Sequence, residues 1–272
     1  MNALHILTET LAAEAIKLGA DPAKIDPDAL VAALSDEDVE AMLAPILADE
    51  ERARFNKFAE LFPDEGPLRR ELYPKHMEFF AASKLYREIC FMAGNRVGKT
   101  VAGGYAATSH LTGQYDDWWP GRRFLHPIDA WVAGDTNETT RDILQHELLG
   151  EVIERDGRKS FDGSGLIPRD CIGNAKWKTG VPDMADTVRI KHTAGGWSNL
   201  AFKSYDQGRK KFQGTAKHLV WLDEECPLDV YDECRIRTMT TRGIVMLTFT
   251  PLEGLTETVL QFLPKEMRPG EE

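Results

Sequence analysis

The sequence of 272 residues contains no run of about eighteen consecutive apolar residues, which a membrane-spanning helix would need. Its first eight residues lack the basic and then apolar pattern of a secretory signal peptide. The four cysteines form no C-x-x-C pair, which argues against a zinc site and favours reduced thiols. These absences predict an intracellular protein that does not enter a membrane.

An excess of basic residues is also missing, since 33 Lys and Arg face 44 Asp and Glu, for a net charge of -11. Proteins that coat nucleic acid without specificity need many Lys and Arg for phosphate contacts, so this class is disfavoured. Local contacts with DNA stay open because the charge is uneven. Residues 35–51 are acidic, whereas residues 209–211 and 235–242 are basic.

Residues 1–65 are rich in Ala, Leu, Asp and Glu and predict an acidic helical appendage. Ser35 is expected to cap one helix, and Pro45 is expected to break or kink it. The turn-rich residues 63–67 mark the expected boundary, so residues 66–272 form the second predicted domain.

In the second domain, apolar strands alternate with helices, which predicts an α/β fold with a mainly parallel central sheet flanked by helices. The expected strands are residues 88–93, 130–134, 218–222 and 244–250, and the expected helices are residues 100–111 and 136–149. Residues 188–192 and 200–205 are predicted to form a hairpin through Gly195-Gly196. No clear period is found in residues 157–182.

A glycine-containing loop with the sequence AGNRVGKT lies between an expected strand and an expected helix. In this arrangement, backbone N–H groups and the helix N-terminus face the phosphates of a nucleotide. Lys99 would contact the β- and γ-phosphates of ATP, and the Thr100 hydroxyl would bind Mg²⁺. Ala93 stands where the G-x-x-x-x-G-K-[ST] pattern has its first glycine, and the alternative is a glycine-rich loop with an incidental Lys-Thr pair. The residues predicted to bind nucleotide here are Ala93, Gly94, Asn95, Arg96, Val97, Gly98, Lys99 and Thr100.

Two adjacent carboxylates, Asp223 and Glu224, end another apolar run. They are expected at the carboxyl edge of the sheet, where open α/β folds bind ligands. Asp223 would bind Mg²⁺, and Glu224 would act as the general base that polarises the attacking water. The alternative is a strand that ends in a helix N-cap, because acidic residues also suit the first turn of a helix.

Further segments resemble the ATPase domain of the terminase large subunits of tailed bacteriophages, the motors that package viral DNA. The segments are the loop at residues 93–100, GQYDDWWPGRRF at residues 113–124, FQGT at residues 212–215, VWLDEE at residues 220–225 and TFTPLEG at residues 248–254. The resemblance extends over about residues 70–260 and implies a P-loop NTPase of the RecA-like (ASCE) type. It also implies ATP and Mg²⁺ as cofactors.

The resemblance implies roles for further residues. Arg96 would contact the γ-phosphate, or it is a surface arginine. Tyr73 and His76 match a segment that contacts adenine, although the family usually has Gln at the position of His76. The alternative for His76 is packing against Phe79 and Phe80.

Coupling and trans-acting roles follow in the same way. Thr248 and Thr250 would sense the nucleotide and couple its state to DNA movement, or they only end a buried strand. An arginine finger donated by a neighbouring subunit is also implied. Gln213 stands at the position where this arginine is expected. The candidate is therefore Arg209, to which a catalytic role is assigned, or a basic residue of 235–242.

The implied function is ATP hydrolysis that powers translocation of double-stranded viral DNA into a procapsid in the host cytoplasm. The implied partners are DNA, the portal protein, the small terminase subunit and further copies in a ring on the procapsid, and an isolated domain is expected to be monomeric and slow. Only about twenty residues follow Pro251, too few for the nuclease domain of the family, so no nuclease activity is expected from this chain. The alternatives are a helicase-like or repair DNA translocase, a nucleotide-dependent small-molecule kinase, and a non-catalytic assembly protein.

Overall fold

A computed structural model of the chain describes residues 3–17, 21–32, 34–155, 157–264 and 266. The chain divides into two compact units, Met1–Phe55 and Asn56–Glu272. This division falls before the turn-rich residues 63–67, and the functional domains 1–65 and 66–272 stay a prediction. None of the described helices is long and apolar enough to cross a membrane, and all four cysteines are free thiols.

The first unit is helical. Its elements are α1 (Ala3–Lys17), a 3-10 turn (Pro22–Lys24), α2 (Pro27–Ala32) and α3 (Asp36–Phe55). The predicted cap is confirmed, because Ser35 Oγ accepts a hydrogen bond of 3.2 Å from the backbone N–H of Asp38. Of the predicted break or kink at Pro45, the break is wrong, since α3 continues through this residue, and the kink stays a prediction. A helix of 20 residues keeps most of its backbone hydrogen bonds when proline removes one donor.

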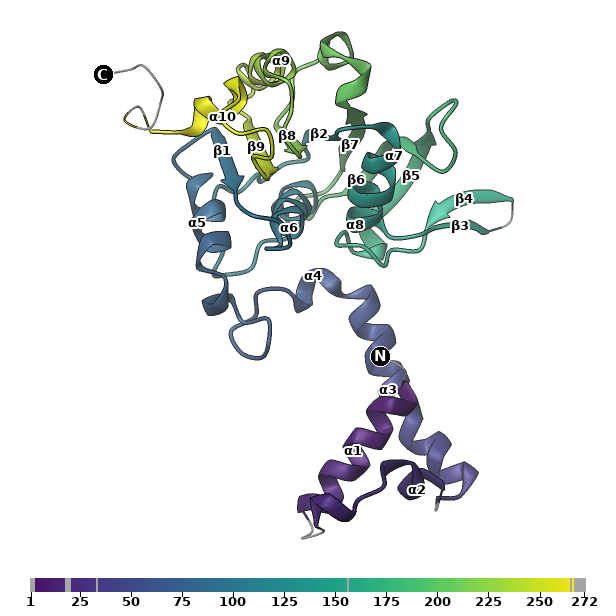
Figure 1. Cartoon of the computed structure of the whole chain (residues 1–272). Coiled ribbons are helices and arrows are strands. Elements are labelled where there is room, and N and C mark those ends of the chain that lie inside the picture. The colour runs from purple at the N-terminus through teal and green to yellow at the C-terminus, as the bar shows by residue number, and fades with distance from the viewer. Residues whose placement is uncertain (1–2, 18–20, 33, 156, 265, 267–272) are drawn as a thin grey trace. The chain divides into compact units, whose positions relative to one another are not determined.

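The second unit contains the sheet (Figure 1). Its helices are α4 (Lys57–Glu60), α5 (Pro74–Ala82), α6 (Lys99–Thr112), the consecutive segments α7 (Asn137–Thr139), a π-helix (Thr140–Gln145) and α8 (His146–Leu149), α9 (Leu228–Thr238) and α10 (Glu257–Phe262). Its strands are β1 (Glu88–Met92), β2 (Asp129–Gly134), β3 (Val152–Arg155), β4 (Arg158–Phe161), β5 (Ile172–Trp177), β6 (Ala185–Lys191), β7 (Trp197–Ser204), β8 (Leu219–Asp223) and β9 (Ile244–Phe249). Short 3-10 turns complete the unit at Arg70–Leu72, Arg169–Cys171, Tyr205–Gln207 and Arg209–Phe212.

Seven strands form the central sheet in the order β1-β9-β8-β2-β7-β6-β5. The five strands from β1 to β7 in this order pair in parallel. β6 then pairs antiparallel with β7, and β5 pairs antiparallel with β6. The predicted mainly parallel sheet and the predicted hairpin of β6 and β7 are therefore confirmed. The separate hairpin of β3 and β4, and the edge strand β5, were not predicted.

Helices cover both faces of the sheet, because neighbouring residues of its central strands enter different apolar clusters. In β8, Trp221 joins the cluster that contains residues of α5 and α6, whereas Val220 and Leu222 join the cluster that contains residues of α9. In β9, Met246 and Leu247 divide in the same way. A strand that is buried on both faces reads as a continuous apolar run, which is why these strands could be recognised from the sequence.

The contact between α6 and β8 is close. A Cβ added at Gly103 would lie 2.4 Å from Cε2 of Trp221, whose side chain is fully buried. The indole also donates a hydrogen bond of 2.7 Å to Thr248 Oγ1, so it cannot move away without loss of this bond. Gly103 therefore allows α6 to approach the sheet.

We expect Gly103→Ala to lower the free energy of unfolding by about 1–3 kcal/mol through overpacking. Gly104→Ala is the matched control, because its added Cβ meets the end of the flexible Leu166 side chain at 2.7 Å. The control should lose less stability in urea titrations of the two variants. Helix propensity alone favours alanine by about 1 kcal/mol, so a stabilised Gly103→Ala would contradict the proposed close contact.

Candidate active site

The candidate site lies at the carboxyl ends of three neighbouring parallel strands, β1, β9 and β8. The loop at residues 93–98 follows β1, Glu224 follows β8 and Thr250 follows β9. Since β9 lies between the other two strands, its last residues lie between the loop and the acidic pair. This edge of an open α/β sheet is the usual place for a ligand.

The loop has two residues in the left-handed region, Arg96 with a φ of 61° and Gly98 with a φ of 78°. Ala93 is not among the residues with positive φ, so its Cβ causes no backbone strain there. An alanine at the first position of the loop is thus compatible with its conformation. The side chain of Arg96 is exposed, and its contact with a γ-phosphate stays a prediction.

Lys99 begins α6 and is buried, with 8% of its surface exposed. Its Nζ donates hydrogen bonds to the carbonyl oxygen of Gly94 at 2.7 Å and to Thr250 Oγ1 at 2.8 Å. Thr250 Oγ1 in turn donates to Asn95 Oδ1 at 2.8 Å. The residue at the end of β9 therefore contacts both the lysine and the loop.

Asp223 is 4% exposed and ends β8. Burial raises the pKa of its carboxyl to about 7, and the charge of Glu224 adds to the rise. Hydrogen bonds from Thr248 Oγ1 at 2.5 Å and from Thr100 Oγ1 at 3.2 Å oppose it. A cation beside this carboxylate would favour its charged form.

The oxygens of Asp223 and Thr100 suit Mg²⁺, which prefers one or two protein ligands together with phosphate and water. Within the described residues, no group of three or more His, Cys, Asp or Glu could hold a metal on its own. The metal ligands Thr100 and Asp223 stay a prediction.

Thr248 is buried, with 1% of its surface exposed. Its hydroxyl accepts from Trp221 Nε1 at 2.7 Å and donates to Asp223 Oδ1 at 2.5 Å. The side chain therefore orients the carboxylate of Asp223. A coupling role for Thr248 and Thr250 remains a prediction.

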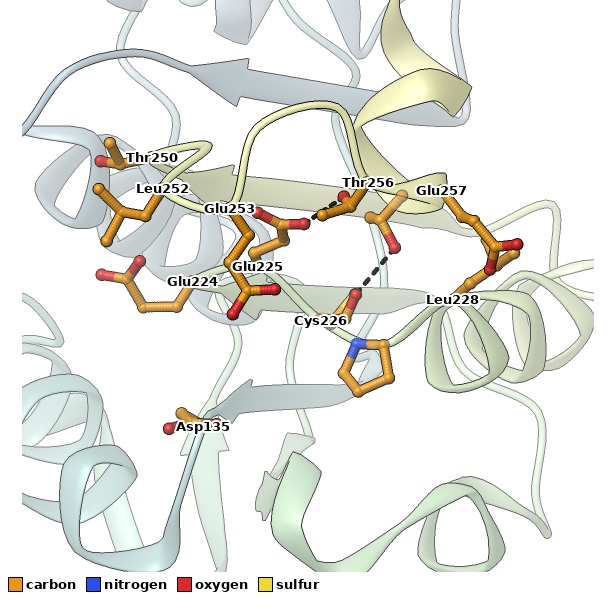
Figure 2. Close-up of a pocket in the computed structure, with 12 residues that line it drawn as sticks. Asp135, Glu224, Glu225, Cys226, Leu228, Thr250, Leu252, Glu253, Thr256 and Glu257 are labelled. Atoms are coloured by element: carbon orange, nitrogen blue, oxygen red, sulfur yellow. Dashed lines mark hydrogen bonds between the residues drawn. The ribbon is translucent and has the colours of Figure 1, made fainter.

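Glu224 has a φ of 61°, and its backbone N–H donates to the carbonyl oxygen of Thr248 at 2.9 Å. Such a backbone is strained by about 1–3 kcal/mol for a residue other than glycine, and strain of this kind clusters at functional sites. The exposed side chain lines a pocket of about 780 Å³ together with Thr250 and Asp135 (Figure 2). The geometry leaves room for a substrate beside the carboxylate.

Two residues of this region were not predicted from the sequence to belong to the site. Tyr205 is fully enclosed, and its hydroxyl donates to the carbonyl oxygen of Asp223 at 2.8 Å. Burial raises its pKa well above the ordinary value. Asp135 lines the pocket directly after β2, and a polar residue after a buried strand is a signal that could have identified it. No local signal distinguishes Tyr205.

His76 lies beside Gly98 of the loop, and its Nε2 is 3.1 Å from a Cβ added at Gly98. Burial lowers the pKa of His76, which favours the neutral imidazole. Its ring contacts are Tyr73, Phe91 and Phe62, with centroids at 5.3, 5.0 and 5.7 Å. The alternative of packing is thus observed, but on rings other than the expected Phe79 and Phe80. Contact of Tyr73 and His76 with adenine stays a prediction.

Three of the basic residues considered for an arginine finger, Arg209, Arg235 and Arg237, are paired within this chain. Arg209 Nε lies 2.9 Å from Glu233 Oε2, and Glu233 also binds Arg237 at 2.9 Å. Arg235 lies 2.7 Å from Glu88 Oε2. Each would have to exchange its carboxylate before it reached a neighbouring subunit, and the catalytic role of Arg209 stays a prediction.

Comparisons with known proteins identify a family. Residues 90–270 match the family described as terminase large subunit, T4likevirus-type, N-terminal. The chain is 36% identical over 253 residues to the terminase large subunit of Salmonella phage P22, a match that includes 87% of this chain and 48% of that protein. The chain therefore spans about half the length of this relative.

Two solved structures of the large terminase from a thermophilic bacteriophage are also similar, one of them in complex with ADP. Their identities are 10% and 13% and their TM-scores are 0.43 and 0.38, with 67% of this chain and 38% of each structure included. These likenesses are too distant to support a statement about function. The match of residues 90–270 is decisive by itself, and the chain belongs to the terminase large subunit family of the T4likevirus type, to the N-terminal part of which it corresponds.

Proposed function

We propose that this chain is a P-loop NTPase that hydrolyses ATP to drive double-stranded DNA into a viral procapsid. One observation supports it most strongly: Lys99, Thr100 and Asp223 converge through Thr250 and Thr248 at one edge of the sheet. Membership in the terminase large subunit family supports the role in DNA packaging. The nucleotide is proposed to be ATP, bound with Mg²⁺.

The proposed work of each residue follows from its chemistry. Lys99 and the backbone of the loop bind the phosphates, and Arg96 reaches the γ-phosphate from the exposed side of the loop. Glu224 accepts a proton from a water that attacks the γ-phosphate. Thr100 and Asp223 would hold Mg²⁺, which neutralises charge on the phosphate oxygens when it is bound.

Coupling is proposed to pass through β9. Thr250 contacts Lys99 and Asn95. Loss of the γ-phosphate would therefore alter the contacts of Thr250 at the end of β9. Thr248 transmits it to Asp223. The larger assembly would include the portal protein, the small terminase subunit and further copies of the chain in a ring within the host cytoplasm, with Arg209 as one candidate for a trans-acting arginine.

Removal of the metal tests this proposal. We expect the full chain to release inorganic phosphate from ATP with Mg²⁺, to stop when EDTA exceeds Mg²⁺, and to resume when Mg²⁺ is restored, because the phosphate charge must be neutralised. Single-turnover conditions with labelled ATP suit a slow enzyme. Phosphate release that persists in excess EDTA would count against the proposed metal ligands. Transfer of the label to a small-molecule acceptor would instead favour the kinase alternative.

A further inference from the structure

A groove with basic walls lies between the hairpin of β3 and β4 and the edge strand β5. This hairpin groove has a volume of about 600 Å³ and is lined by Arg155, Arg158, Lys159 and Arg169, together with the aromatic rings of Phe161 and Trp177. The two rings pack on each other with centroids 5.3 Å apart. The lining of the groove therefore combines aromatic rings with cationic side chains.

A second hollow of about 410 Å³ shares Gly173 and Asn174 with the hairpin groove and adds Arg189 and Trp197. The indole of Trp197 packs directly against Gly173, because a Cβ added at Gly173 would lie 2.5 Å from Trp197 Cζ3. This tryptophan is 42% exposed. The two hollows thus adjoin each other, and the described residues that line them include five cationic side chains and no carboxylate.

Three arginines of the other basic segments, Arg209, Arg235 and Arg237, are neutralised within the chain. Residues 209–211 and 235–242 contribute arginines that pair with Glu88, Asp232 and Glu233. By contrast, Arg155, Arg158 and Arg189 form no ion pair or side-chain hydrogen bond within the described parts of the chain. Lys159 of the groove pairs with Asp183 at 2.7 Å, whereas these three arginines offer positive charge without a counter-charge among the described residues.

Like charges held together repel one another unless a ligand brings several negative charges at once. The phosphates of duplex DNA do this, with one charge per about 1.7 Å of helix axis, and Arg is suited to bind them. Ser160 and Asn174 add polar groups of the kind that contact phosphate and sugar. The chemistry of the groove thus matches a nucleic acid backbone.

We propose that the hairpin groove, together with the hollow at Arg189, binds the phosphate backbone of double-stranded DNA. The proposal rests on the proposed function, in which this chain acts on DNA. β5 and β1 are the opposite edges of the sheet, so the groove and the phosphate loop are separate places (Figure 1). DNA binding and ATP hydrolysis can therefore be perturbed independently.

The test uses the full chain, a fluorescent duplex of about 30 base pairs and anisotropy at several salt concentrations. Arg158→Ala/Arg189→Ala removes one cation from each hollow. We expect it to raise the Kd on the order of tenfold at low salt, and to lower the slope of log K against log salt by about two. Lys210→Ala/Lys211→Ala is the matched control, because it removes two exposed charges elsewhere and should have a smaller effect.

The two proposals fail in different ways. If the groove variant kept its DNA affinity, or if the control lost as much DNA affinity, the proposed DNA-binding role of the groove would be overturned. The proposed ATP hydrolysis would be unaffected by either result. Tighter binding of polyglutamate than of the duplex would assign the groove to an acidic protein partner and overturn it as well. We expect thermal unfolding and basal ATP hydrolysis of the groove variant to match those of wild type.

Discussion

Glu224→Gln is expected to slow ATP hydrolysis by about 10²- to 10⁴-fold, the usual contribution of a general base, while ATP affinity stays nearly unchanged. Glutamine keeps the shape of the side chain, so the left-handed backbone and the hydrogen bond to the carbonyl of Thr248 are retained. It cannot accept the proton of the attacking water. The loss should therefore appear in the chemical step, measured as single-turnover phosphate release, with binding measured separately.

Glu253→Gln is the matched control for this variant. Its carboxylate is exposed and lines the same pocket, but Glu253 lies in the loop after β9 and does not belong to the acidic pair at the end of β8 (Figure 2). We expect it to hydrolyse ATP at a rate close to wild type. If Glu224→Gln were as active as wild type, or if both variants lost activity equally, Glu224 would not be the general base.

Lys99→Met is expected to weaken ATP binding by roughly 10- to 100-fold, because a charge-assisted hydrogen bond contributes about 1.5–3 kcal/mol. Methionine fills the buried space but carries no ammonium group. Hydrolysis should also fall, since charge on the phosphates grows as the bond to the γ-phosphate breaks. Equilibrium binding of a fluorescent ATP analogue measures the first effect, and phosphate release measures the second.

The stability of this variant should change little. The carbonyl of Gly94 belongs to an exposed residue and can bind water, and Thr250 Oγ1 keeps its bond to Asn95. Lys84→Met, at an exposed lysine outside the predicted nucleotide-binding residues, serves as the control for loss of one positive charge. Wild-type ATP affinity in Lys99→Met, at an unchanged melting temperature, would rule out the proposed phosphate contact.

Local patterns were enough to locate the loop between β1 and α6 and most of the parallel strands. Strands buried on both faces read as apolar runs, and Gly113 ends α6 in the left-handed conformation that glycine favours. β3, β4 and β5 were not predicted from the sequence. Most of their residues are exposed or half-buried, so apolar and polar residues do not alternate clearly along them. The register of β5 with β6 is also irregular.

The sequence by itself determined the strand–loop–helix unit at Lys99 and the apolar strand that ends in Asp223 and Glu224, because each depends on neighbours within about ten residues. Only the tertiary structure decided that β9 lies between β1 and β8, which brings Thr248 to Asp223 and Thr250 to Lys99. It also decided which arginines are neutralised by Glu233 and which line the hairpin groove. The physical reason is that pairing between distant strands and charges depends on non-local packing, which no short segment encodes.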